Sequence, residues 1–91
     1  MLLNRFPERH REYLASDLKM NYNYYSNVIL RQAFQRELVH PRSIFYYTSF
    51  TTQNIGKCLC DEGFFKAVPR IGVPSYRFTK EGLIECFTRF L

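Results

Sequence analysis

Apolar side chains recur at helical spacing most clearly in residues 26–39, SNVILRQAFQRELV. The stripe that they form consists of Ile29, Leu30, Ala33, Phe34 and Leu38. This spacing predicts an amphipathic helix. Pro41 should end the helix, because the residue before a proline is disfavoured in helical conformation.

The segments on either side of this helix carry weaker patterns. Residues 7–20 begin with a proline suited to a first helical turn and predict a short amphipathic helix, with Leu14 and Leu18 four apart. Residues 21–27, NYNYYSN, are rich in Asn and Ser and predict a cap or turn. Residues 42–50, RSIFYYTSF, fit a strand or a short buried helix, and the pattern leaves both open.

A second helix is predicted over residues 51–63. Thr51 or Thr52 can serve as its N-cap, and Gly63 is placed to end it in a left-handed conformation. Ile55, Cys58 and Leu59 give it an apolar face.

The C-terminal part predicts a hairpin followed by a closing helix. Residues 64–68 and 75–79 read as two short strands around the connection PRIGVP, whose proline and glycine residues disfavour a helix. Thr79 is the expected N-cap of the last helix. The apolar face expected for that helix consists of Leu83, Ile84, Phe87, Phe90 and Leu91.

The length of 91 residues suits one domain spanning 1–91, with N-terminal helices at 7–41, a middle unit at 42–79 and a C-terminal helix at 80–91. The fold class predicted is therefore α+β and mainly helical. Aromatic residues make up 18% of the chain, which supplies a core and leaves a surplus for a partner.

Charge favours an anionic partner. The chain carries 13 basic and 8 acidic residues, for a formal net charge of +5. Most of this excess falls between residues 42 and 80, where six basic residues face two acidic ones. Nucleic acid is the first class of partner that such a balance indicates.

Composition and motifs argue against several other classes of function. Cys58 and Cys60 point to different sides of a helix, and Cys86 and the two histidines are scattered, so no metal site or cofactor is expected. A catalytic set is also missing from the sequence, which predicts a protein that is not an enzyme. With an odd cysteine count and no apolar run long enough for a membrane span, the expected location is the cytoplasm.

The segment SFTTQNIGKCLCDEGFFKAVPRIGVPSYRFT, residues 49–79, resembles the winged helix-turn-helix family. It is similar to the small winged-helix modules of phage and viral replication proteins, and YRFTKEGL is similar to the strand-to-helix joint of small bacterial transcription regulators. In this resemblance Phe50 corresponds to the apolar residue of the tight turn. The resemblance implies a helix-turn-helix, a two-stranded wing and a closing helix.

The resemblance implies a non-catalytic protein that binds double-stranded DNA as a regulator or accessory factor. The start of the recognition helix would place Thr52, Gln53 and Asn54 in the major groove, where Gln and Asn can pair with adenine. The basic residues expected at phosphate or on the wing are Lys57, Lys66, Arg70, Arg77 and Lys80.

A second function class stays open, a protein-interaction module that modulates a host enzyme or complex. Its contact surface would use aromatic residues, namely Tyr22, Tyr24, Tyr25, Phe87 and Phe90. The same tyrosines could stack on RNA bases. The apolar C-terminal end could form a homodimer interface or dock on the first helix.

Overall fold

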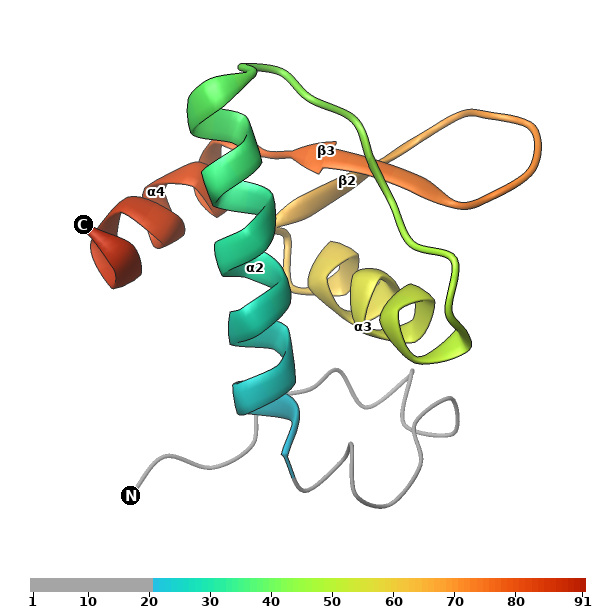
Figure 1. Ribbon diagram of the computed structural model, residues 1–91, viewed down its shortest axis with the longest axis horizontal. Coiled ribbons are helices and arrows are strands. Elements are labelled where there is room, and N and C mark those ends of the chain that lie inside the picture. The colour runs from blue at the N-terminus through green and yellow to red at the C-terminus, as the bar shows by residue number, and fades with distance from the viewer. Residues whose placement is uncertain (1–20) are drawn as a thin grey trace.

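The structure is a computed structural model that describes residues 21–91. The helix expected at 7–20 lies outside the described residues. The described part forms three helices and a three-stranded antiparallel sheet. In chain order the elements are α2 (Tyr22–Val39), β1 (Phe45–Tyr46), α3 (Phe50–Asp61), β2 (Phe65–Val68), β3 (Ser75–Phe78) and α4 (Lys80–Phe90) (Figure 1). The coarse prediction of a mainly helical α+β fold is confirmed.

Helix α2 begins at Tyr22 with Asn21 at its N-cap position, so of the cap or turn predicted over residues 21–27 the turn is wrong, because residues 22–27 are helical. The helix extends toward the N-terminus because Tyr22 and Ser26 continue its buried face by one turn each. Tyr22 is fixed there by a hydrogen bond of 2.8 Å from its hydroxyl to Oε1 of Glu62. At the other end Leu38 is exposed, so the buried stripe stops at Phe34. The helix ends before Pro41 as predicted.

Residues 42–49 contain a strand, which resolves the ambiguity of this segment. Arg42 has a positive φ of 63°, and the Glu37 carboxylate accepts hydrogen bonds from the backbone N–H groups of Arg42 and Ser43 at 2.8 and 3.2 Å. These contacts turn the chain after α2 and direct it into β1. Consequently the helix expected before the tight turn is not formed, and α3 is the one helix between β1 and β2.

Helix α3 starts earlier than predicted. Ser49 is its N-cap, because the Ser49 hydroxyl accepts a hydrogen bond from the N–H of Thr52 at 3.2 Å. Phe50 therefore lies in the first helical turn and is exposed, instead of filling a tight turn. The predicted C-terminal glycine is confirmed. Gly63 has φ of 83°, and the N–H of Phe64 reaches the carbonyl of Leu59, a Schellman motif.

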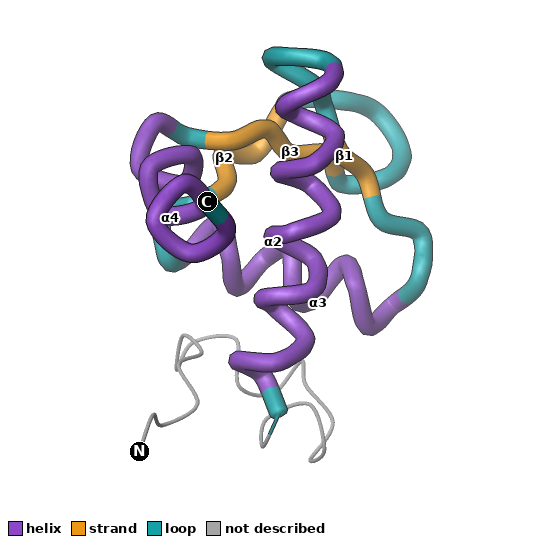
Figure 2. Tube along the Cα trace, turned by 60° about the vertical axis from the view of Figure 1, so that its left-hand side comes forward, coloured by secondary structure: helices purple, strands orange, loops and turns teal. Residues whose placement is uncertain are grey.

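The sheet has the order β1-β3-β2, with β3 in the centre. Both hairpin strands fall within one residue of their predicted bounds. The inner face of the sheet is aromatic. The Phe65 ring stacks on the Tyr76 ring with 5.8 Å between centroids and meets the Phe78 ring edge-on at 5.2 Å. The strands form one band behind α2, and the β2–β3 connection extends away from the helices (Figures 1 and 2).

Helix α4 is attached to the end of the hairpin by Thr79. As predicted, the Thr79 hydroxyl caps the helix by accepting a hydrogen bond from the N–H of Gly82 at 2.9 Å. Gly82 lies against the backbone of Phe64, and this contact sets the rotation of α4. The expected apolar face is therefore partly wrong, because the helix buries Cys86 while Ile84 and Phe87 are exposed.

Candidate nucleic-acid interface

The outer face of the sheet carries two basic residues directly opposite each other. Side chains alternate between the faces of a strand, so Phe65 and Tyr76 point inward while their neighbours Lys66 and Arg77 point outward. Lys66 and Arg77 are register partners across β2 and β3, and both are exposed. Like charges at such a position repel and destabilise the sheet.

The same outer face includes an exposed aromatic residue. Tyr46 is 61% exposed and is the register partner of Ser75 on β3. Ser75 is buried, because Tyr46 and Val68 flank it on the two neighbouring strands. The hydroxyl of Ser75 donates to the carbonyl of Val73 at 3.1 Å and so anchors the end of the connection between β2 and β3.

The connection between β2 and β3, residues 69–74, is called the wing here, because it occupies the position at which the sequence predicts one. Arg70 is exposed and Ile71 is fully exposed near its tip. Gly72 has φ of 101°, a left-handed conformation that allows the chain to turn there. The wing and Tyr46 border a shallow groove of about 360 Å³ on the outer side of the sheet. Arg70 thus lies beside the groove on the same projecting hairpin as Lys66 and Arg77.

Acidic side chains are absent from this stretch of the sequence. Residues 63–80 include Lys66, Arg70, Arg77 and Lys80 and contain neither Asp nor Glu. Within the part of the chain that the structure describes, Lys66, Arg70 and Arg77 form no ion pair. Their positive charges are consequently not neutralised by neighbouring carboxylates of that part.

Of the predicted reading residues at the start of α3, Thr52 and Gln53 take part in local hydrogen bonds, and Asn54 is buried. Thr52 is half-buried, and its hydroxyl contacts the Ser49 hydroxyl at 2.7 Å. The Gln53 amide donates to the carbonyl of Tyr47 at 2.9 Å and thereby holds the loop before α3. Asn54 is 2% exposed and lies in the core, where it cannot reach a base edge.

The remaining basic residues of the predicted site lie at different positions. Lys57 is half-buried on α3. Lys80 is exposed at the first position of α4, directly after the strand that carries Arg77. The structure therefore groups Lys66, Arg70 and Arg77 on the hairpin, with Lys80 following the end of β3.

The aromatic residues predicted to bind a partner divide into buried and exposed ones. Tyr22 is buried and bonded to Glu62, so a partner role for its side chain is wrong. Tyr24 is exposed and meets Tyr25 edge-on at 5.3 Å. Phe87 is half-exposed and contacts Phe34 at 5.1 Å, as does the half-buried Phe90 at 6.1 Å.

The cysteines behave as core residues. Cys58 and Cys86 are fully buried free thiols, and Cys60 is half-buried. Burial raises the pKa of Cys58 from 9.0 to about 12, with a further contribution from Glu62, and raises the pKa of Cys86 to about 11. Among residues 21–91 the structure brings together no group of three residues that could hold a metal ion.

Two features of this surface are absent from the predicted DNA-binding site. Tyr46 is not among the residues predicted to bind DNA, although alternation in a strand would place its side chain on the other face of the sheet from Phe45. The direct opposition of Lys66 and Arg77 depends on the hairpin register, which requires the length of the wing to be known.

Comparisons with known proteins identify no relative: no family model, curated protein or solved structure matches the chain. Within the described residues, no helix is long and apolar enough to cross a membrane.

Proposed function

We propose that this protein is a small non-catalytic DNA-binding protein of the winged-helix type, which acts as a regulator or accessory factor. The outer face of the sheet and the wing form its contact surface. The start of α3, where a winged helix would present its reading residues, is occupied by capping and core contacts. In this proposal DNA is held mainly through its phosphates.

The element order supports a winged-helix arrangement. A helix, a strand, a second helix and a hairpin follow one another, and the strand before α3 joins the hairpin at the side of β3. The difference is the replacement of one helix by the extended segment around β1. A protein built this way retains the wing and has a shorter helix-turn-helix part.

The opposition of Lys66 and Arg77 is the observation that carries the proposal. A cross-strand pair of like charges costs stability in the free protein. An anion that lies between the two side chains relieves this repulsion. The phosphate groups of the DNA backbone are anions of this kind. Arg70 on the wing extends the same basic surface.

The proposal can be tested by fluorescence anisotropy with a labelled random-sequence duplex at low salt. We expect the wild-type protein to bind and the Lys66→Gln/Arg77→Gln variant to bind about tenfold more weakly or worse. The control is Arg31→Gln/Arg36→Gln, which removes the same charge from α2 instead of the sheet. Equal binding by both variants, or none by the wild type, would reject the sheet surface.

A second candidate function is protein binding through α4, which one specific observation favours. Ile84 and Phe87 on this helix and its C-cap residue Leu91 are spaced i, i+3 and i+7 and are 56%, 50% and 76% exposed. An exposed apolar stripe of this kind is typical of an interaction surface. It would serve a homodimer or a host protein, and light scattering of wild type and Phe87→Ser distinguishes the dimer from the monomer.

A further inference from the structure

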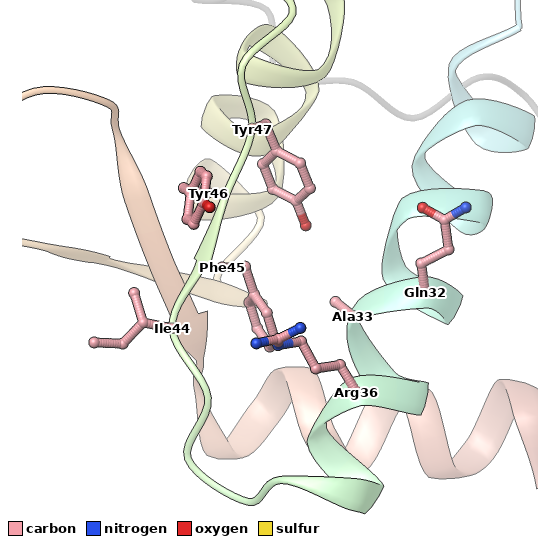
Figure 3. Close-up of a pocket in the computed structure, with 7 residues that line it drawn as sticks. All are labelled: Gln32, Ala33, Arg36, Ile44, Phe45, Tyr46 and Tyr47. Carbon is pink, nitrogen blue, oxygen red and sulfur yellow. The ribbon is translucent and has the colours of Figure 1, made fainter.

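A second concave site lies between α2 and the segment that carries β1. It is a cleft of about 360 Å³, and one wall is formed by Gln32, Ala33 and Arg36 and the other by residues 44–47. Ala33 and Phe45 are buried core residues, so the base of the cleft is apolar. Figure 3 shows the Arg36 guanidinium extending from α2 toward β1 and the Tyr47 hydroxyl pointing back toward α2.

The charge of Arg36 is not neutralised within the described part of the chain. Its neighbour Glu37 is engaged elsewhere, because its two carboxylate oxygens accept hydrogen bonds from the backbone N–H groups of Arg42 and Ser43. Arg36 is exposed and has no ion pair with the acidic residues of this part. A guanidinium without an ion-pair partner can donate two parallel hydrogen bonds to the two oxygens of a carboxylate.

Tyr47 contributes a second donor. Its side chain is half-buried, and its ring packs near Tyr76 at 6.3 Å. Burial raises the pKa of Tyr47, so the hydroxyl remains protonated at physiological pH. Within residues 21–91 this hydroxyl has no hydrogen-bond partner, so it is available to donate to an acceptor in the cleft. An acceptor from a ligand in the cleft would satisfy it.

The backbone beside the cleft is an open sheet edge. The strand order places β1 at the edge of the sheet, and no strand in the described part pairs with its other side. Unpaired edge strands accept an additional strand from a partner chain, with alternate side chains entering pockets beside the sheet. An extended segment running along β1 would direct every second side chain toward α2.

We propose that this cleft binds an extended peptide segment that carries a carboxylate side chain. The peptide backbone adds to the open edge of β1, and its Asp or Glu carboxylate accepts hydrogen bonds from Arg36 and Tyr47. Neighbouring apolar side chains of the peptide cover Ala33 and Phe45. The site adjoins the groove on the outer face of the sheet at Tyr46, but Arg36 and Tyr47 are not part of that groove, and the peptide proposal does not depend on DNA binding.

The test is a titration of the ¹⁵N-labelled full chain, followed by NMR, with the peptide acetyl-Thr-Val-Glu-Val-Thr-amide. A matched peptide carries Gln in place of Glu. We expect saturable shifts of the Ala33, Phe45 and Tyr47 amide signals, with the Gln peptide binding about tenfold more weakly because it lacks the charge-assisted bond. Arg36→Gln should show a loss of about the same size, and Tyr47→Phe a smaller one.

Two controls complete the design. Lys66→Gln/Arg77→Gln should bind the Glu peptide as tightly as the wild type, because its changes lie on the other face of the sheet. Inorganic phosphate should leave the three signals unmoved at the same concentrations. The proposal is overturned if both peptides bind equally, if phosphate reproduces the shifts, or if no saturable shift occurs at millimolar peptide. Should Arg36→Gln fail to fold, the comparison of the two peptides on the wild type still decides.

Discussion

Single residues set how closely the elements of this fold approach one another. A Cβ atom at Gly82 would lie 2.1 Å from the backbone oxygen of Phe64, a distance that no side chain can occupy. A Cβ atom at Gly56 would lie 2.9 Å from the Tyr76 ring. The first glycine brings α4 against the hairpin, and the second brings α3 against the inner face of the sheet. Both are requirements of space, since neither residue has a positive φ.

We predict that Gly82→Ala destabilises the protein although alanine favours helices. The added methyl group would clash with the backbone of Phe64, and relief of that clash requires a backbone shift. We expect the net effect, including the gain in helix propensity, to lower the free energy of unfolding by about 1–3 kcal/mol. Urea unfolding followed by circular dichroism measures the change. Glu81→Ala, an exposed change in the same helical turn, serves as the control and should cost less than about 1 kcal/mol, the value of a carboxylate near a helix N-terminus. Equal stability of both variants would show that α4 is not held at Gly82.

The buried thiols predict a loss of stability at alkaline pH. The folded state raises the pKa of Cys58 from 9.0 to about 12 and that of Cys86 to about 11, so only the unfolded chain ionises them just above pH 9. Their contribution is complete below pH 9 and declines as pH rises, each group by up to about 1.4 kcal/mol per pH unit.

Urea unfolding at pH 8 and pH 10.5 tests this pH dependence. The wild type should lose more stability between the two pH values than Cys58→Ala/Cys86→Ala, whatever the absolute stability of the variant. Parallel losses would mean that neither thiol is shielded from water in the folded state.

At the scale of elements, the sequence predicted what local chemistry determines and missed what packing determines. Thr79 as a cap, Gly63 as a helix end and the hairpin strands were correct, because each depends on neighbouring residues. The start of α2 was wrong because Tyr22 is drawn into the helix by Glu62, a residue forty positions away.

The candidate site was also predicted only in part, where local sequence features determine it. Arg70 and Arg77 were identified from charge, and both lie on the exposed hairpin. Gln53 and Asn54 were assigned to a reading face, but the capping residue Ser49 starts α3 earlier than expected. Asn54 is buried by tertiary packing, and β1 is a two-residue strand that periodicity alone could not separate from a short helix.

The hairpin predicts a conflict between stability and binding. Arg77→Thr removes the cross-strand repulsion with Lys66 and places a β-branched residue on the strand. We expect the melting temperature to rise by about 2 °C and duplex binding to weaken. Thermal unfolding and anisotropy on the same samples measure both. A variant that melts lower and binds as tightly as the wild type would indicate that Lys66 and Arg77 do not repel each other.

At the scale of the described molecule, residues 21–91, the candidate contact surfaces lie in three places. The hairpin is basic, the exposed apolar stripe lies on α4, and the cleft with Arg36 lies between α2 and β1. The basic hairpin is the part on which the proposed function depends.

The most direct test of that function is the salt dependence of duplex binding. The logarithm of the binding constant should fall linearly with the logarithm of salt concentration, with a slope of about −0.9 for each phosphate neutralised. Lys66→Gln/Arg77→Gln should therefore reduce the slope by about two, while Arg31→Gln/Arg36→Gln leaves it unchanged. A slope that stays the same in the hairpin variant would show that these side chains do not contact phosphate, and the account of the basic sheet surface would be wrong.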